Sequence, residues 1–503
     1  MDAKIIVNRN FVVSEIDPRI FSGFIEHLGR AVYEGIYEPG HPEADSSGFR
    51  QDVCNMVKEL NMPLTRYPGG NFVSAYNWED GIGPREKRPK RLDFAWKSLE
   101  TNQFGTDEFM DWCPKAGTAP MMAVNLGTRG PVEAQAMVEY CNCNHGSFWS
   151  DLRRNNGHEQ PYAVKIWCLG NEMDGPWQAG HKNAEDYGKI ALEAAKMMKN
   201  TDPSIELVVC GSSYMNMSTF GDWDATVLKY TYDFADYISL HAYYNNRNDD
   251  TPLFLAQAEK MEQQIKKIAA VCDYVAALRR SNKTMMLSFD EWNIWYHSNG
   301  QEKNSEEWTA ARPILEDIYN MEDALLAGCM LITLLNNADR VKIACLAQTV
   351  NVIAPIMTGK GGSAWRQTIF YPFKYTAGYG RGRVLRQIID SPAYEVEFES
   401  GNPRQISCLI STVVYNEQAG EISIFAVNRS LEEDMSLKVI LGEFSPSGVI
   451  EWLTMHHDDL KACNSEGHEH IVPEAAAGAE IENGCLEAVL PAASWNMIRV
   501  EVS

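Results

Sequence analysis

Two glutamates in distant parts of the chain have sequence neighbours that point to catalysis. Glu172 belongs to the run Gly170-Asn171-Glu172-Met173, and Glu291 belongs to Phe289-Asp290-Glu291-Trp292-Asn293. Each follows a short apolar run typical of a buried β-strand, where a carboxylate is rare unless it is paired or functional. Retaining glycoside hydrolysis needs two carboxyl groups about 5–5.5 Å apart, one as general acid/base and one as nucleophile. We therefore assign Glu172 as the acid/base and Glu291 as the nucleophile; the alternative for either is a salt-bridged carboxylate at a strand end.

Eight apolar, β-like runs lie between residues 18 and 375, and each is followed by a segment with helical periodicity. The runs cover residues 21–25, 63–67, 120–125, 164–169, 206–210, 237–241, 285–289 and 342–347. Helices are expected, among other places, at residues 49–60, 184–199, 261–275 and 312–335. This alternation predicts a (β/α)8 TIM barrel over residues 18–375. In such barrels the chemistry lies at the carboxyl ends of the strands, where both glutamates fall.

After about residue 376 the periodicity of the apolar residues changes to two. Tyr394, Val396 and Phe398 alternate with glutamates, and similar alternation recurs over residues 422–426 and 437–441. This pattern predicts an antiparallel β-sandwich. The N-terminal stretch 4–13 is also strand-like, and we expect it to join the same sandwich. The second domain is therefore predicted to comprise residues 1–17 and 376–503.

Polar residues gather where the predicted barrel strands end, and sugar hydroxyl groups favour carboxylate and amide partners. Asn171 can donate to a sugar 2-hydroxyl, a contact that strengthens in the transition state. The Tyr243 hydroxyl can orient the nucleophile. The candidate substrate-binding residues of this kind are Glu26, Asn71, Asn171, Tyr243 and Gln348. Core packing is the alternative for Tyr243 and for the neighbouring His241.

Three tryptophans in loops at the same end of the barrel are candidate pocket walls, because aromatic faces pack against the C–H faces of sugars. They are Trp96, Trp177 and Trp295, and ordinary packing is the alternative for each. The pair Gly69-Gly70 is not followed by the lysine of a phosphate-binding loop. A tight turn that brings Asn71 into the pocket is the better interpretation of these glycines.

The composition indicates a globular protein that does not bind nucleic acid. The 503 residues are 45% hydrophobic and 22% charged, with a formal net charge of −23, whereas phosphate binding draws on excess Lys and Arg. The N-terminus lacks a basic region followed by a long apolar one, and no apolar stretch approaches the length of a membrane span. The expected location is therefore the cytoplasm, with the twelve cysteines as reduced thiols.

Three further segments have a suggestive composition. Cysteines and a histidine at residues 141–145, and four histidines within residues 456–470, faintly resemble metal sites, but neither has a zinc spacing. We expect a helix end and an exposed polar loop there, and neither a metal nor a cofactor. The basic run 85–91 is expected to be a solvated or intersubunit loop.

Longer motifs around these residues make the chain resemble the α-L-arabinofuranosidases of glycoside hydrolase family 51, in clan A. Members of this clan carry the acid on barrel strand four and the nucleophile on strand seven. The matching motifs occupy residues 24–27, 66–72, 78–84, 105–109, 170–177, 290–293 and 494–498. The resemblance implies the same roles for Glu172 and Glu291, and arabinose binding by Glu26, Asn71, Asn171, Tyr243 and Gln348.

The resemblance also implies an architecture and an activity. Family members combine a TIM barrel with a jelly-roll sandwich, need no cofactor and are often hexamers, so we expect a homo-oligomer built as a trimer of dimers. They remove terminal non-reducing α-L-arabinofuranosyl residues from arabinan, arabinoxylan and their oligosaccharides with retention of configuration.

Two other functions stay open from the sequence. The same barrel could carry an endo-β-1,4-glucanase, with an open cleft, or a β-xylosidase, with a pyranose-shaped pocket. A non-catalytic carbohydrate-binding protein would be favoured by a missing carboxylate, but both glutamates are present. Loops such as residues 296–312 are expected to set the preferred glycan.

Overall fold

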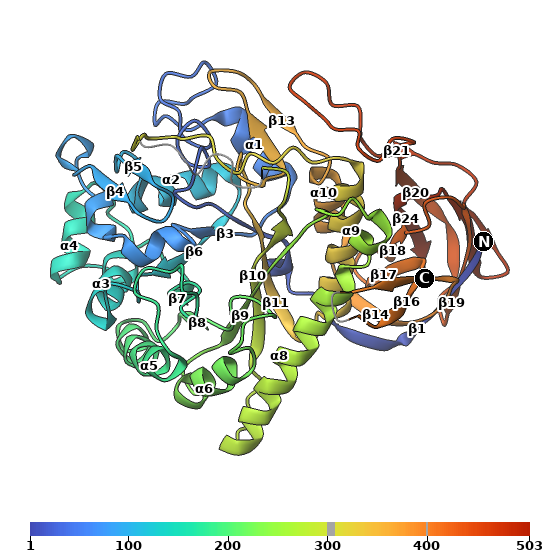
Figure 1. Cartoon of the computed structure of the whole chain (residues 1–503), viewed down its shortest axis with the longest axis horizontal. Coiled ribbons are helices and arrows are strands. Elements are labelled where there is room, and N and C mark those ends of the chain that lie inside the picture. The colour runs from blue at the N-terminus through green and yellow to red at the C-terminus, as the bar shows by residue number, and fades with distance from the viewer. Residues whose placement is uncertain (299–306, 399–400) are drawn as a thin grey trace.

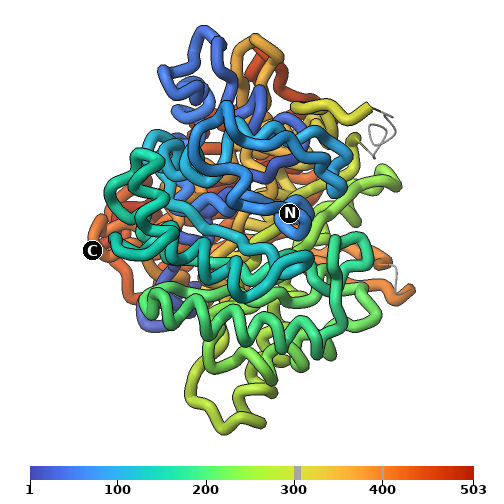
Figure 2. The backbone as a smooth tube through the Cα atoms, turned by 90° about the vertical axis from the view of Figure 1, so that its left-hand side faces the viewer, coloured from blue at the N-terminus to red at the C-terminus, as the bar shows by residue number. Residues whose placement is uncertain are grey.

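The protein consists of a barrel and a β-sheet domain that lie side by side (Figure 1). The computed structural model describes residues 1–298, 307–398 and 401–503. Both chain termini lie in the sheet domain (Figure 1). Seen from the barrel side, the blue-to-green segments stand in front of most of the red C-terminal ones (Figure 2).

Eight parallel strands close into a barrel, as the sequence predicts. Around the barrel the order is β10-β11-β2-β3-β6-β7-β8-β9. The strands are β2 (Ser22–Phe24), β3 (Leu64–Tyr67), β6 (Ala119–Val124), β7 (Ile166–Leu169), β8 (Glu206–Val209), β9 (Tyr237–Tyr244), β10 (Met286–Ile294) and β11 (Val341–Ala347). Nearly every residue of these strands is buried, because a parallel barrel is covered on the inside by its own side chains and on the outside by helices.

Helices follow the strands in the expected alternation. They are α1 (Gln51–Glu59), α2 (Thr106–Ala116), α3 (Pro131–Asn142), α4 (Phe148–Asn155), α5 (Ala184–Thr201), α6 (Asp222–Thr231), α7 (Thr251–Leu255), α8 (Ala258–Arg279), α9 (Met321–Asn336) and α10 (Phe370–Tyr379). Asn183 caps the start of α5, since its side chain accepts a hydrogen bond from the Asp186 N–H. Within the described residues, no helix is both long and apolar enough to cross a membrane.

The start of α9 differs from the prediction. A helix was expected from residue 312, but α9 begins at Met321. Asn320 accepts a hydrogen bond from the Asp323 N–H and Asp323 in turn accepts from the Asn320 N–H, which forms a capping box. This reciprocal cap fixes the first turn nine residues later than the apolar pattern indicated.

Ten strands form one large sheet in the second domain, in the order β21-β20-β24-β18-β17-β14-β1-β19-β23-β22. Their bounds are β1 (Asp2–Glu15), β14 (Arg383–Asp390), β17 (Leu409–Asn416), β18 (Glu421–Asn428), β19 (Met435–Gly442), β20 (Pro446–Met455), β21 (Glu474–Ala475), β22 (Glu480–Glu482), β23 (Cys485–Leu490) and β24 (Ser494–Val502). The sheet curls around its own apolar core, so that β20 contacts β22 although they lie near opposite ends of the order.

The N-terminal strand lies inside this sheet. β1 pairs antiparallel with β14 and parallel with β19, so one parallel pair interrupts the otherwise antiparallel arrangement. The first strand of the chain is therefore built into the C-terminal sheet. The exact division of the domains, at residues 17 and 376, stays a prediction.

The predicted strand at residues 394–398 lies outside the large sheet. The alternating residues at 394–398 were expected in the sandwich, but β15 (Ala393–Glu397) pairs only with β16 (Pro403–Ser407) in a separate hairpin. Val396, Phe398 and Ile406 pack with Ala256, next to α7. Alternation identifies a strand with one apolar face, but here that face packs against the barrel.

The basic run 85–91 is less exposed than expected. The Arg88 side chain is buried and bonds Glu108 of α2 and the carbonyl oxygens of Gly83 and Asn102. Arg85 also pairs with Glu108. Arg85 and Arg88 are therefore tied to their own barrel by ion pairs, and the expectation of a solvated loop is wrong for Arg88. Four other residues of the run, Glu86, Lys87, Lys90 and Arg91, are exposed as expected, and the intersubunit role stays a prediction.

The barrel and the sheet domain pack together through α9. Every residue of α9 except Asn336 is buried, and the helix contacts β17, β18 and β24 of the large sheet. At Gly328 a Cβ atom would collide with Cδ1 of Trp495 on β24 and would touch Val427 on β18. The close approach of α9 to the sheet therefore requires a glycine at this position.

We expect Gly328→Ala to lower the stability of the protein by about 1–3 kcal/mol, because the added methyl group overpacks a buried contact. Gly378→Ala in α10 is the matched control, since a Cβ there meets only the side-chain nitrogen of Asn61 at 4.0 Å. The control should leave stability unchanged or raise it by up to about 1 kcal/mol. Thermal unfolding midpoints measure both; equal midpoints would contradict this account of the interface.

Candidate active site

A pocket of about 290 Å³ opens at the carboxyl ends of the barrel strands. The sequence-predicted residues on its wall are Glu26, Asn71, Trp96, Glu172, Trp177, Tyr243, Glu291, Trp295 and Gln348. The structure thus brings together residues from most of the barrel. Asn171 is the exception, because it is buried and is not one of the residues that line the pocket.

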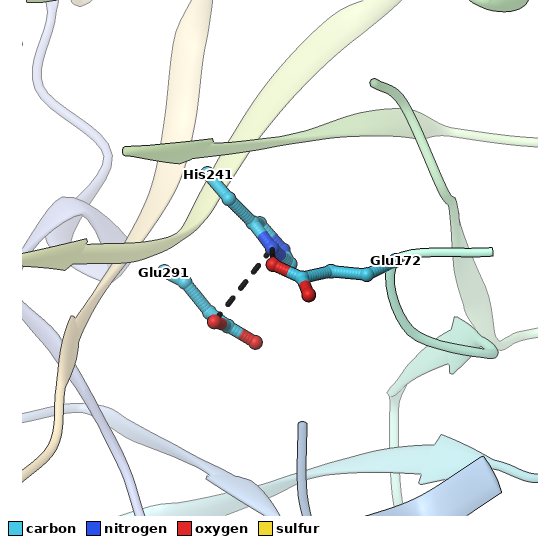
Figure 3. A group of neighbouring side chains, drawn as sticks. All are labelled: Glu172, His241 and Glu291. Atoms are coloured by element: carbon cyan, nitrogen blue, oxygen red, sulfur yellow. Dashed lines mark hydrogen bonds and ion pairs between the residues drawn. The ribbon is translucent and has the colours of Figure 1, made fainter. Parts of the chain in front are cut away.

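The two glutamates face each other across this pocket. A carboxylate oxygen of Glu172, one of Glu291 and a ring nitrogen of His241 all lie within 4.8 Å of one another. Figure 3 shows the three side chains converging from separate strands and loops. This separation is close to that of retaining glycosidases and shorter than the roughly 6.5–9.5 Å that inverting enzymes need to place a water.

The Glu291 carboxylate accepts hydrogen bonds from two side chains. Arg66 on β3 donates from Nη1 to Oε1 at 2.8 Å, and the Tyr243 hydroxyl donates to Oε2 at 2.8 Å. The Arg66 side chain is itself buried and extends its other nitrogen, Nη2, to Oδ1 of Asn171 at 2.7 Å. Charge-assisted bonds of this kind fix the direction of the carboxylate.

Glu172 has an environment that favours its protonated form. Burial raises the pKa of Glu172, and the negative charge of Glu291 raises it further, while hydrogen bonds from His241 and Trp177 oppose the shift. Trp177 donates from Nε1 to Oε2 at 2.6 Å. The backbone of Glu172 has φ of +43°, a region that L-residues rarely adopt and that recurs at functional sites.

His241 bridges the acidic groups. Its ring nitrogens lie 2.9 Å from Glu172 Oε1 and 3.1 Å from Asp290 Oδ1. Burial by itself lowers the pKa of His241, but Glu291, Asp290 and Glu172 together outweigh it and raise the pKa to about 10. As an imidazolium, the ring donates to both carboxylates and balances part of their charge.

Glu26 forms a second polar centre on the pocket wall. Its carboxylate accepts hydrogen bonds from the Phe72 N–H at 2.9 Å, from Trp96 Nε1 at 2.9 Å and from Gln348 Nε2 at 3.2 Å. Burial raises its pKa to about 8, against the effect of the donors from Phe72 and Trp96. A Cβ at Gly70 would collide with this carboxylate. The backbone bends at Pro68 and Gly70, and Asn71 lies on the pocket wall as expected.

Comparison with known proteins identifies the family. The model of the α-L-arabinofuranosidase 1 domain matches residues 56–266, and that of the α-L-arabinofuranosidase C-terminal domain matches residues 290–494. The chain is 55% identical over 499 residues to the intracellular exo-α-(1→5)-L-arabinofuranosidase 1 of Bacillus subtilis, covering 99% of both chains. The chain belongs to the α-L-arabinofuranosidases of glycoside hydrolase family 51.

Further similarities agree with this membership. The structure of a family 51 α-L-arabinofuranosidase from Bifidobacterium longum matches with a TM-score of 0.94 at 43% identity over 99% of both chains. An exo-α-(1→6)-L-arabinofuranosidase from Bifidobacterium longum is 47% identical over 99% of this chain and 97% of that protein. The protein is thus a glycoside hydrolase, and the resemblance seen in its sequence motifs is confirmed.

Three features of this family 51 site were not singled out from the sequence. Arg66 was noted only within a motif, although an arginine in a buried strand is as unusual as a glutamate and could have been noticed. His241 was given no role from the sequence, where core packing was its alternative, yet it lies at the centre of the site. Tyr214, on the loop after β8, lines the pocket beside Tyr243, and no signal in a single sequence marks it.

The trio Glu172, His241 and Glu291 is the one group in the described parts of the chain with three metal-ligating side chains this close together. Its ligand atoms are already engaged by hydrogen bonds, and the Arg66 guanidinium supplies a positive charge at 2.8 Å from Glu291. A cation would have to compete with this arginine and with His241. The residues present therefore suit a hydrogen-bonded carboxylate pair better than a metal centre.

Proposed function

We propose that this family 51 enzyme is an exo-acting α-L-arabinofuranosidase that works by double displacement with retention of configuration. The proposal rests on one observation: a carboxylate oxygen of Glu172, a carboxylate oxygen of Glu291 and a ring nitrogen of His241 lie within 4.8 Å of one another. That spacing leaves room for direct attack by a carboxylate but not for an intervening water, as retention requires.

In the first step, Glu291 attacks the anomeric carbon while Glu172 gives its proton to the leaving oxygen, and the glycosidic C–O bond breaks. The arabinosyl ester on Glu291 has lost the negative charge that raised the pKa of Glu172. The pKa of Glu172 therefore falls at the moment when it must act as a base. Glu172 then takes a proton from water, which attacks the anomeric carbon and releases Glu291.

The remaining polar residues are proposed to bind the arabinofuranose hydroxyls. Glu26, Asn71 and Gln348 line the pocket, and Nδ2 of Asn171 has no hydrogen-bond partner among the described residues. We assign that donor to the sugar 2-hydroxyl, because a buried donor without a partner is costly in the free enzyme. A small, walled pocket fits one terminal sugar and therefore supports exo action over the open cleft of an endo-glucanase.

The substrates proposed are arabinan, arabinoxylan and their oligosaccharides, and we infer (1→5) as the preferred linkage because the more similar relative is named for it. The test is the kcat/KM for α-(1→5)- and α-(1→6)-linked arabinofuranosyl disaccharides, beside 4-nitrophenyl α-L-arabinofuranoside and the corresponding β-xylopyranoside. Faster turnover of the xyloside than of the arabinofuranoside would contradict the proposed sugar.

Trp177→Phe is expected to move the basic limb of the pH profile of kcat/KM upward by roughly half a pH unit to one pH unit. The indole N–H bonds Glu172 and lowers its pKa, and one hydrogen bond is worth about 1 kcal/mol. Its loss raises the pKa, so Glu172 keeps its proton to higher pH. Trp96→Phe is the matched control, since that indole donates to Glu26; it should raise KM and leave the limb in place. An unmoved limb in Trp177→Phe would argue against Glu172 as the acid.

We also propose that the protein acts in the cytoplasm and assembles as a hexamer, a trimer of dimers. The location is supported by close relatives that are named intracellular. Light scattering after size-exclusion chromatography tests the assembly; a monomeric mass would overturn it.

Residues 299–306 of the predicted specificity loop 296–312 lie outside the described residues.

A further inference from the structure

A second cavity, of about 440 Å³, lies next to the active site at the barrel mouth. It lies between the end of β9, the helix α8 and the β15–β16 hairpin. Tyr214 and Tyr243 line both this cavity and the catalytic pocket, so the two spaces share a wall. A glycan whose terminal arabinose occupies the catalytic pocket would reach this cavity by extending its leaving group past these two tyrosines.

The charge of this cavity is opposite to that of the protein. The chain carries 68 acidic and 45 basic residues, yet the cavity wall contains Lys260, Lys267 and Arg404 and no Asp or Glu. Among the described residues, none of these three cations forms an ion pair. Two glutamates on α8 are engaged elsewhere, since Glu259 pairs with Arg429 and Glu262 pairs with Lys266.

Each cation contacts an aromatic ring or a thioether sulfur. The ammonium of Lys260 lies 5.3 Å from the ring centroid of Phe398, and the guanidinium of Arg404 lies 5.8 Å from the same ring. The Nζ atom of Lys267 lies 3.8 Å from the sulfur of Met215. Aromatic and thioether contacts of this kind orient a cation without neutralising it. The charges stay available to an anionic ligand.

Amide side chains complete the wall and suit a sugar. Gln263 is half-buried beside Lys260, while Gln257 and Asn245 are bonded to each other. We propose that this cavity binds the leaving-group side of substrates that carry a hexuronic acid, with Lys260, Lys267 and Arg404 facing its carboxylate. The inference rests on the proposed function, because it assumes that the neighbouring pocket holds arabinose. Carboxylate is the anionic group that sugars themselves carry, and charge complementarity then selects the glycan.

The test compares two substrates that differ only in this carboxylate. One is an arabinofuranosyl oligosaccharide with a hexuronic acid in its leaving group, and the other is the same compound after reduction of the carboxyl to a neutral hexose. At low ionic strength the kcat/KM of the charged substrate should exceed that of the neutral one by roughly fivefold, and the ratio should fall with added salt. A ratio of one at low ionic strength overturns the proposal.

The double variant Lys260→Gln/Arg404→Gln tests whether these two cations cause the preference for the charged substrate. We expect it to bring the ratio of the two kcat/KM values close to one, whereas Lys58→Gln on α1, an exposed cation on another face of the barrel, should keep the wild-type ratio. A ratio that survives in the double variant overturns the site. If neither substrate is turned over, the proposed function fails instead. Calorimetry then measures the affinity of the wild type and of the double variant for the free uronic-acid oligosaccharide. Equal affinities would overturn the cavity site independently of turnover.

Discussion

Glu291→Gln is expected to lower kcat on 4-nitrophenyl α-L-arabinofuranoside by roughly 10⁴-fold or more, because the covalent step loses its nucleophile. The amide keeps the size of the side chain, and its oxygen can still accept from Arg66 in place of the 2.8 Å carboxylate bond. The fold should therefore survive. The loss corresponds to about 5 kcal/mol or more of transition-state stabilisation.

The matched control is Glu185→Gln, which removes an exposed carboxylate on α5 that pairs with Lys189. It should retain wild-type kcat, and circular dichroism should be unchanged in both variants. A Glu291→Gln enzyme that keeps more than a tenth of wild-type activity would mean that the nucleophile is misassigned.

Glu172→Ala is expected to affect substrates according to their leaving groups. For an arabinofuranosyl disaccharide, whose leaving oxygen needs a proton, kcat/KM should fall by roughly 10²–10⁴-fold. For the nitrophenyl substrate, whose leaving group departs without protonation, kcat/KM should fall by less than about 10-fold. The second step also loses its base, so nitrophenol should appear in a burst followed by slow turnover.

Azide provides the internal control for this variant, because it attacks the arabinosyl ester without giving up a proton. Added azide should speed the slow phase of Glu172→Ala and leave the wild type unchanged. Equal losses of kcat/KM on both substrates, or a slow phase that azide does not affect, would contradict the assignment of Glu172 as the acid/base.

The barrel could be predicted because its strands are short apolar runs that end in polar residues out of place in a core. Glu172 and Glu291 follow such runs, and the alternation with helices left few other architectures. The first turn of α9 was misplaced because the reciprocal cap of Asn320 and Asp323 outweighed the apolar pattern upstream. The strand at 393–397 was recognised, but periodicity does not say which sheet or helix will cover its apolar face.

Contacts between side chains explain what the sequence did not reveal in the site. The importance of Arg66 lies in the two bonds that it makes to Glu291 and Asn171, 225 and 105 positions away. His241 acquires its role from three carboxylates that surround it in space. Tyr214 joins the pocket through the path of a loop. A single sequence carries residue types and spacings, whereas these roles depend on distances between remote segments.

The most direct test of the central claim is the anomeric configuration of the first arabinose released from 4-nitrophenyl α-L-arabinofuranoside, followed by proton NMR before mutarotation. The separation of Glu172 and Glu291 predicts α-L-arabinofuranose as the initial product, because two inversions at the anomeric carbon restore the starting configuration. Initial release of the β-anomer would show a single displacement by water and would contradict the role of Glu291 as nucleophile.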